Sequence, residues 1–338
     1  MKYKKMALVL ALGVGLSACN NQQPVENNTK TEVSEEANNE KVDKKVENSN
    51  QNMESVSVYA SFFPIYNLTK QIAGDKFDVR SFTNLKTESH GWEPSAKDIA
   101  ELSNSQVMFI NGAGMEEWEE SLESSSEIEL VNTTVNIDLL EGSHENEENE
   151  DHGHEDYDNG HNHGEFDPHT WLSPKNGIAQ AKVIAEKLSE IDPANKDYYM
   201  DNCKKIEEEL NAMIDEYTEK FENLDNKNFL VSHQAFGYLA HDFGLNQIAL
   251  TSLGATEDAD AKTLRDAILK AKNLGINTVF YEMGGSDKSA NTIADEIGAK
   301  TVPLNTLEFA TDEELNNGTS YQDLIKYNLE ELYKSMEK

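Results

Sequence analysis

The chain has 338 residues, 37% of them hydrophobic, and a formal net charge of −34. This length is sufficient for a large buried core. The acidic balance argues against nucleic acid or anionic lipid as binding partners. It fits a protein that attracts cations, although the charged surface of a soluble exported protein is the alternative and explains most of it. With two cysteines in all, Cys19 and Cys203, disulfides contribute little and the fold must rely on its core.

The first 18 residues have the features of a secretion signal. Lysines at the start are followed by an apolar run over 7–16, which is too short to span a bilayer. Leu16-Ser17-Ala18-Cys19 resembles a bacterial lipobox, which implies cleavage before Cys19 and a lipid on its thiol; a plain secretory signal with an incidental Cys19 is the alternative. We therefore expect an extracytoplasmic protein, anchored to the outer face of the cell membrane. Loss of the signal removes three lysines and brings the net charge near −37.

Residues 19–54 are polar and contain almost no large apolar side chains. Such a segment cannot bury enough surface to fold, so it is predicted to be a disordered tether. From residue 55 onward, predicted strands alternate with predicted helices. This alternation indicates an α/β fold of two lobes, each with a mainly parallel sheet flanked by helices. The N-terminal lobe is expected over 55–192 and the C-terminal lobe over 225–338.

In the N-terminal lobe, short apolar runs predict strands, and capped amphipathic runs predict helices. The predicted strands are 56–63, 77–82, 107–110 and one within 130–140. The predicted helices are 64–73, 95–104, 116–122 and one that begins after Ser173-Pro174.

A long helix over 193–224 is predicted to join the lobes. Asp192-Pro193 breaks the preceding helix, and apolar residues then recur at helical spacing as far as Phe221. About 30 residues of helix span roughly 45 Å, which suits a rigid connection along a whole lobe. In the C-terminal lobe the predicted strands are 229–231, 247–250, 278–281 and 300–304, and the predicted helices are 236–243, 261–274, 289–297 and 321–336.

A histidine-rich, acidic insertion occupies 143–165 and leads directly into Asp167-Pro168-His169. Six of the chain's nine histidines lie within 26 residues there. Those of the insertion are His144, His152, His154, His161 and His163. Imidazole with carboxylate suits divalent metals such as zinc, so the insertion is interpreted as a weak, auxiliary metal collector that tight binding does not need. The alternative is a disordered acidic segment with incidental histidines.

Four residues outside this insertion are candidate ligands of one metal ion. His90, His233 and Glu282 lie at or beyond the carboxyl ends of predicted strands, where open parallel sheets bind ligands. His169 precedes a predicted helix. Taken singly, each has an ordinary alternative role as a loop residue, a helix cap, a buried hydrogen-bonded histidine or a partner of a lysine. If the lobes face each other, three imidazoles and one carboxylate can converge, a set that suits zinc.

Several motifs resemble the zinc- and manganese-binding lipoproteins of ABC transporters, the cluster A-I substrate-binding proteins. They are Thr87 to Pro94, Asp167 to Pro174, His233 to Tyr238, Phe280 to Glu282 and Leu304 to Glu308, and the resemblance covers about 55–338. It implies two lobes joined by a long rigid helix, with the metal between them and His90, His169, His233 and Glu282 as ligands. Trp92 and Ala96 depart from the family's usual tyrosine and proline. These departures bear on the residues that surround the ligands and not on the identity of the four ligands.

The resemblance implies a monomeric, non-enzymatic protein that captures zinc and delivers it to an ABC permease and its ATPase. Three nitrogens beside one carboxylate favour Zn²⁺ over Mn²⁺, which prefers harder oxygen ligands. A manganese-binding homologue is one alternative. A zinc hydrolase or lyase, with water in an open fourth position, is another, and a surface adhesin is a third.

Overall fold

The computed structural model describes residues 57–86, 89–102, 105–142, 166–251, 253 and 259–337. The expected signal over 1–18, the tether over 19–54 and the lipidation site Cys19 lie outside these residues. The five histidines of the insertion over 143–165 lie outside them too.

The N-terminal lobe is built on a parallel sheet, which among the described residues has four strands in the order β2-β1-β3-β4. Ser57 pairs with Asp78 and with Ser105, so the strands are aligned with their carboxyl ends at one edge. The strands are β1 (Ser57–Ala60), β2 (Asp78–Ser81), β3 (Ser105–Ile110) and β4 (Glu129–Asn132), and the helices are α1 (Phe63–Ala73), α2 (Ala96–Glu101) and α3 (Glu119–Ser125).

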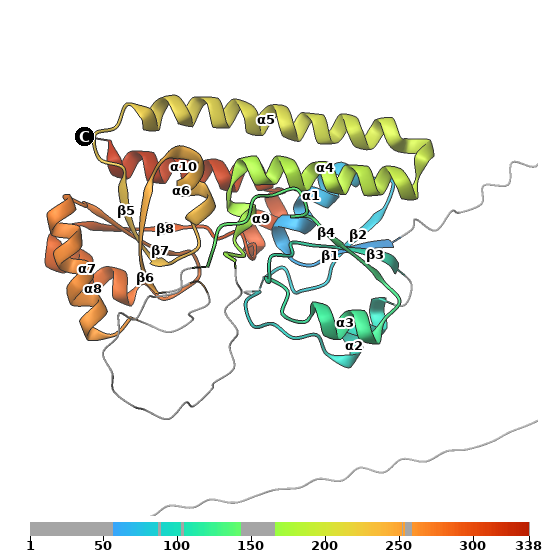
Figure 1. Cartoon of the computed structure of the whole chain (residues 1–338), viewed down its shortest axis with the longest axis horizontal. Helices are drawn as coiled ribbons and strands as arrows, with labels where there is room; N and C mark the ends of the chain where they lie inside the picture. Colours follow the sequence, from blue (N-terminus) through green and yellow to red (C-terminus); the bar gives the residue numbers. More distant parts are fainter. Residues whose placement is uncertain are drawn as a thin grey trace, which may run out of the picture. The chain divides into compact units, whose positions relative to one another are not determined.

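The C-terminal lobe repeats this strand order. Its described sheet is parallel with the order β6-β5-β7-β8. Its strands are β5 (Asn228–His233), β6 (Asn246–Thr251), β7 (Thr278–Glu282) and β8 (Lys300–Leu304). Its helices are α6 (Gly237–Phe243), α7 (Ala261–Leu274), α8 (Lys288–Ile297), α9 (Asp312–Asn317) and α10 (Tyr321–Met336). The expectation of two α/β lobes with parallel sheets is confirmed (Figure 1).

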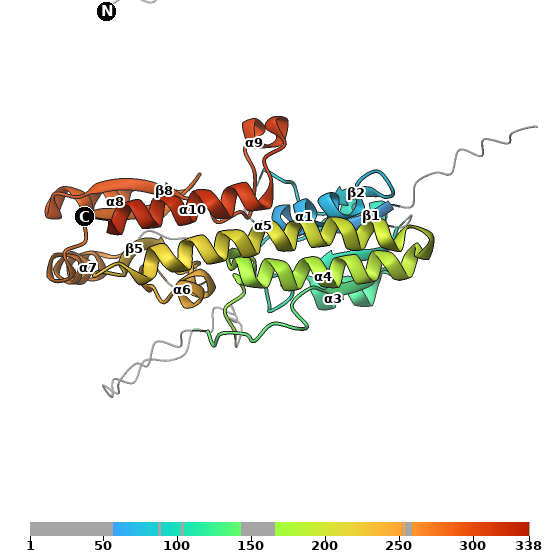
Figure 2. The ribbon, with the colours of Figure 1, turned by 90° about the horizontal axis from the view of Figure 1, so that it is seen from above.

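Two long helices, α4 (Pro174–Ile191) and α5 (Lys196–Glu222), run side by side, and α5 passes along both lobes (Figures 1 and 2). The predicted break between them is present, because Pro193 lacks the N–H that a continuous helix needs. The Asp192 carboxylate accepts a hydrogen bond from the Tyr199 hydroxyl (2.7 Å), which fixes the turn. The connecting helix is therefore three residues shorter at its start than the predicted 193–224, since 193–195 form a 3₁₀ turn.

One apolar core joins the lobes beneath these helices. The buried face of α5 carries Cys203, Leu210 and Phe221, and the cluster that they enter includes Val58 of β1 and Phe229 of β5. A helix whose apolar face packs on both lobes resists bending between them, because each lobe would have to expose that surface. The core therefore supports the long helix as a rigid connection.

Two further differences from the prediction have local causes. The strand expected over 56–63 ends at Ala60, because Phe63 already begins α1 with Pro64 in its first turn. The short helix α9 was not predicted. The Thr311 side chain and the Glu314 carboxylate cap its start reciprocally. This capping signal is easy to overlook in the sequence because the helix has only six residues.

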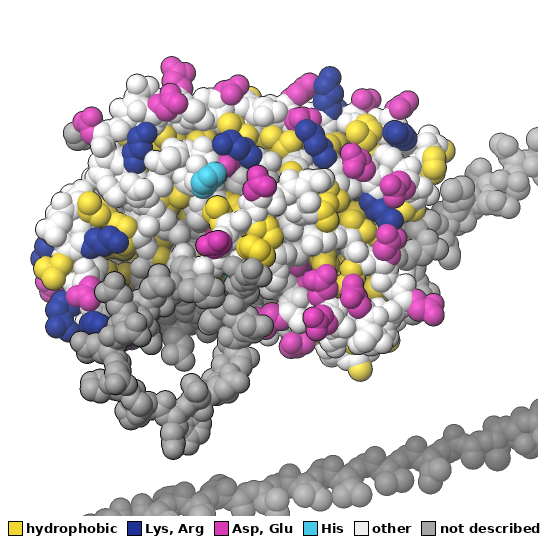
Figure 3. Space-filling view, in the orientation of Figure 1, with side chains coloured by type: hydrophobic (Ala, Val, Ile, Leu, Met, Phe, Trp, Pro, Cys, Tyr) yellow, Lys and Arg dark blue, Asp and Glu magenta, His cyan; other side chains and the backbone are white. Residues whose placement is uncertain are grey.

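No described helix has both the length and the apolar character that a membrane span requires. On the face in Figure 3, acidic side chains lie among lysines along the upper helices and gather over α2 and α3. The first turn of α3 is acidic, with Glu119 and Glu120.

Gly177 in α4 leaves room for Tyr321, which anchors the start of α10. A Cβ at residue 177 would lie 2.8 Å from the Tyr321 ring, while the Tyr321 hydroxyl donates to the Trp171 carbonyl (2.6 Å). We expect Gly177→Ala to lower the free energy of unfolding by about 1–2 kcal/mol, since overpacking costs up to about 3 kcal/mol and the gain in helix propensity is about 1 kcal/mol. Urea unfolding of the metal-free protein measures this.

The control for that substitution is Glu186→Ala on the exposed face of the same helix. It should change the free energy of unfolding by less than about 0.5 kcal/mol. A Gly177→Ala protein as stable as the unaltered chain would show that the space around Tyr321 is not tight.

Candidate metal centre

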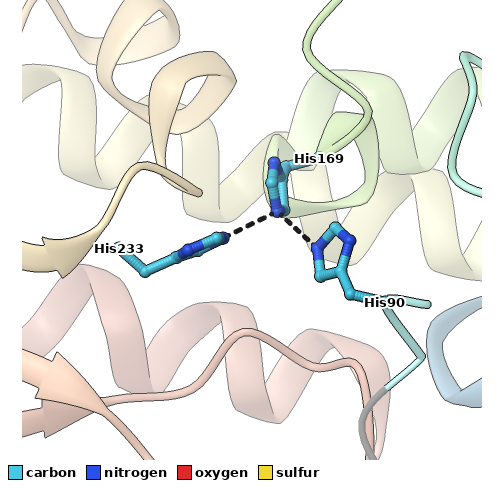
Figure 4. A group of neighbouring side chains, drawn as sticks. All are labelled: His90, His169 and His233. Atoms are coloured by element: carbon cyan, nitrogen blue, oxygen red, sulfur yellow. Dashed lines mark hydrogen bonds between the residues drawn. The ribbon is translucent and has the colours of Figure 1, made fainter. Parts of the chain in front are cut away.

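Three histidines from different segments meet at one point between the lobes (Figure 4). His90 lies in the loop between β2 and α2, His169 precedes a 3₁₀ turn over Thr170–Leu172, and His233 is the last residue of β5. The His169 Nε2 atom lies 3.1 Å from Nε2 of His90 and 3.2 Å from Nε2 of His233. The structure thus brings together the three histidines singled out from the sequence.

The separations of these nitrogens suit a small tetrahedral ion. Zinc binds imidazole nitrogen at about 2.0–2.1 Å, so neighbouring ligand atoms around a tetrahedral zinc are about 3.3 Å apart. The two Nε2 separations, 3.1 and 3.2 Å, are close to that value. Among the described residues, these three form the group of side chains whose ligand atoms lie within 4.8 Å of one another.

Burial and a carboxylate prepare His169 to be a ligand. Its side chain is fully buried, and its Nδ1 lies 2.8 Å from Oδ1 of Asp167, which also accepts from the His169 backbone N–H (2.9 Å). Burial, aided by the neighbouring His90, lowers the pKa of His169 well below its usual value. The imidazole is therefore neutral near pH 7, with its proton on Nδ1 and its Nε2 lone pair directed at the centre.

Asp167 is itself buried, and burial raises its pKa to about 7 against the opposing hydrogen bond from His169. A bound cation would favour the ionised carboxylate and so strengthen the hydrogen bond to His169. The sequence prediction named Asp167 only as part of the motif and gave it no role.

The N-terminal lobe holds the His169 turn through Asn111, a fully buried residue just after β3. The Asn111 amide donates to the Pro168 carbonyl (2.9 Å), and its oxygen accepts from the Thr170 hydroxyl (2.7 Å) and from Gln180 (2.9 Å). Because these bonds lie on both sides of His169, they fix the direction in which its ring projects.

A carboxylate that the sequence prediction did not choose lies beside His90. Oε1 of Glu308 is 3.5 Å from Nε2 of His90, the nitrogen that faces the other two imidazoles, and the Glu308 side chain is fully buried. The predicted ligand Glu282 ends β7, where its Oε1 accepts a hydrogen bond from the Thr306 hydroxyl (2.8 Å). A sequence signal for Glu308 existed, since it follows β8 at the same edge of the sheet.

The turn that carries Glu308 is held in an unusual backbone conformation. Leu307 has φ of +60°, a left-handed conformation that costs a non-glycine residue of order 1–3 kcal/mol. It is maintained by a hydrogen bond from the Leu307 N–H to the Asn305 side chain (2.7 Å) and by the Trp171 indole, which donates to the Thr306 carbonyl (2.7 Å). The turn aims Glu308 at His90, and Trp171 connects it to the His169 segment.

A third buried carboxylate, Glu116, supports the end of β3. It accepts hydrogen bonds from the backbone N–H groups of Asn111 and Gly112 (both 2.8 Å), yet burial raises its pKa from 4.5 to about 7. The folded protein therefore retains this proton to higher pH than the unfolded chain. The stabilisation is fully present below pH 4.5 and is lost as the pH rises through about 7.

We expect the metal-free protein to lose stability between pH 5 and pH 8 by more than a Glu116→Gln variant does. At about 1.4 kcal/mol per pH unit between the two pKa values, the difference approaches about 3 kcal/mol. Urea unfolding at several pH values measures it. Parallel pH profiles for the two proteins would show that Glu116 is ionised throughout.

The fold and this group of residues define a class of protein. Two α/β lobes, joined by a long helix and contributing imidazoles to one point, are the architecture of a metal-binding substrate-binding protein. The chain belongs to the family of the zinc-uptake complex component A (ZnuA), whose sequence profile matches residues 58–335.

Individual relatives agree with this assignment. The high-affinity zinc uptake system protein ZnuA of Bacillus subtilis is 37% identical over 84% of this chain and 88% of its own length. The laminin-binding protein Lmb of Streptococcus agalactiae, described as an adhesin with metal-transporting activity, has a similar structure, with a TM-score of 0.72, 28% identity, and coverage of 83% of this chain and all of that one. The Zn(II)-bound AdcA of Streptococcus pneumoniae gives a TM-score of 0.70 at 30% identity, over 84% of this chain and 58% of that longer chain.

Proposed function

We propose that the protein is the extracytoplasmic zinc-capturing component of an ABC importer, holding Zn²⁺ between its lobes and delivering it to a membrane permease served by an ATPase. The observation that carries this proposal is the convergence of three Nε2 atoms at zinc-like separations. The names of the relatives, which refer to zinc uptake and zinc binding, support the same cargo.

In the proposed site His90, His169 and His233 supply three nitrogens, and Glu308 supplies the carboxylate. Glu308 is favoured over Glu282 because it is fully buried and lies 3.5 Å from a nitrogen that faces the centre. A carboxylate in the fourth position leaves no place for the water that a catalytic zinc activates, so the arrangement suits retention of the ion rather than hydrolysis. Three nitrogens with one oxygen also favour zinc over manganese.

The remaining features of the proposal concern residues outside the described ranges. A lipid on Cys19 would anchor the protein, as a monomer, to the outer face of the membrane. The histidines between 143 and 165 would bind zinc weakly and raise its concentration near the site.

Calorimetry and metal analysis of the full chain test the proposal. We expect one zinc ion per chain, bound far more tightly than manganese, and a strain lacking the gene should fail under zinc limitation and recover with added zinc. Preferential manganese binding, or a growth defect that zinc does not relieve, would overturn it.

A further inference from the structure

Tyr238 of the C-terminal lobe holds the segment that leads into His169. It is a buried residue in the first turn of α6, the short helix that follows β5 (Figure 1). Its hydroxyl donates to the Asp167 carbonyl (2.8 Å) and accepts from the Leu140 N–H (3.0 Å). One phenol thus contacts two chain segments that are 27 residues apart in the sequence.

Those two segments are also paired with each other. The Asp167 N–H donates to the Leu140 carbonyl (2.9 Å), and Glu141 and Phe166 form an antiparallel bridge. Tyr238 therefore completes a set of hydrogen bonds around the backbone of Asp167. Burial raises the pKa of Tyr238 to about 12, so its hydroxyl keeps its proton at neutral pH.

The side chain of Asp167 lies between His169 and α6. One oxygen, Oδ1, accepts from the His169 ring and backbone (2.8 and 2.9 Å). The other, Oδ2, lies against Gly237, where an added Cβ would come within 2.6 Å of it. The C-terminal lobe therefore fixes both the backbone and the carboxylate of Asp167, the residue that orients His169.

We propose that Tyr238 and Asp167 form a support between the lobes that holds His169 in its metal-binding orientation, so that zinc is held tightly only while α6 contacts this segment. The inference rests on the proposed function and adds to it a way in which the bound zinc could be released. Asn111 holds the His169 turn from the N-terminal lobe, and Tyr238 holds it from the C-terminal lobe. If docking to a permease separates α6 from Asp167, the carboxylate loses its position and His169 becomes a weaker ligand.

The test compares Tyr238→Phe with Tyr327→Phe in the full chain. Both remove one hydroxyl from the C-terminal lobe, but that of Tyr327 donates to the Pro303 carbonyl (3.0 Å) and takes no part in the support. Loss of a group that hydrogen-bonds a ligating histidine commonly weakens metal binding about 10–100-fold, and Tyr238 acts on His169 through such a group, Asp167. We expect zinc to dissociate about 10-fold faster from Tyr238→Phe and at the unaltered rate from Tyr327→Phe. Asp167→Asn, which removes the charge, should weaken zinc binding by up to about 100-fold.

A second measurement separates positioning from general stability. In the metal-free protein the His169 Nδ1–H should give a slowly exchanging NMR signal, and in Tyr238→Phe this signal should exchange faster or shift, whereas Tyr327→Phe leaves it unchanged. If Tyr238→Phe does not fold, Gly237→Ala displaces the same carboxylate and replaces it in both measurements. Equal dissociation rates and an unchanged imidazole signal would overturn the inference. Because the signal is read without metal, failure of the unaltered chain to bind zinc would count against the proposed function alone.

Discussion

Replacing His169 with alanine is expected to abolish tight zinc binding. Its Nε2 atom is the one that lies close to the other two imidazole nitrogens, at 3.1 and 3.2 Å. Structural zinc sites with four ligands bind with about 10–16 kcal/mol, so each ligand is worth roughly 3–4 kcal/mol, or about 10²–10³-fold in affinity. Competition titration with a zinc chelator measures a loss of this size.

The matched control for this substitution is His241→Ala. His241 is exposed on α6, and losing it should leave the affinity unchanged. Deleting 143–164 should also preserve tight binding, because the three converging histidines lie outside that segment. A His169→Ala protein that binds zinc as tightly as the unaltered chain would remove the proposed centre; loss of affinity in the deletion variant would instead assign the tight site to the insertion.

Much of the fold follows from patterns that act over short stretches of chain. Apolar runs such as 278–281 predict strands because a strand buried on both faces needs them, and β7 extends one residue further, to Glu282. The break at Asp192-Pro193 is equally local. The alternation of strands and helices then restricts the topology, since parallel strands need helical crossovers and those crossovers place the carboxyl ends of the strands together.

The histidines could be identified for the same reason. His233 directly ends β5 and His90 follows β2 by a loop, so a general rule about strand ends places both near the cleft. His169 does not end a strand, and its identification as a candidate ligand depended on the motif Asp167 to Pro174. Proximity, however, is all that such rules provide. The 3.1 and 3.2 Å separations that define a metal centre come from the packing of the two lobes.

The choice of carboxylate shows where sequence reasoning stops. Glu282 and Glu308 both lie at the carboxyl edge of the same sheet, one ending β7 and the other four residues past β8. Which of them faces His90 depends on the left-handed backbone of Leu307. That backbone is held by the hydrogen bond that the Asn305 side chain accepts from the Leu307 N–H, and by the one that Trp171 donates to Thr306. Leucine itself gives no signal for that conformation, and the contact with Trp171 that helps to hold it is distant in sequence.

Glu308→Gln is expected to weaken zinc binding on the order of 10²-fold, whereas Glu282→Gln should cost less than about 10-fold. Glutamine preserves the shape of each side chain and removes its charge. At residue 308 the substitution removes the charge of the carboxylate that we propose as a Zn²⁺ ligand, which is buried beside His90. A neutral amide oxygen compensates the charge of a divalent cation poorly. At residue 282 an amide oxygen can still accept the hydrogen bond from Thr306 that the carboxylate accepts now.

Competition titration of the two variants under identical conditions decides between the carboxylates, and X-ray absorption of the zinc-loaded proteins reports the ligands directly. The unaltered chain should give three nitrogen ligands and one oxygen ligand from protein. In Glu308→Gln the oxygen position should be taken by water, because the three imidazoles stay in place. The reverse order of affinities would assign the fourth position to Glu282, as the sequence predicted, and would leave Glu308 as a hydrogen-bonding partner of Ser89.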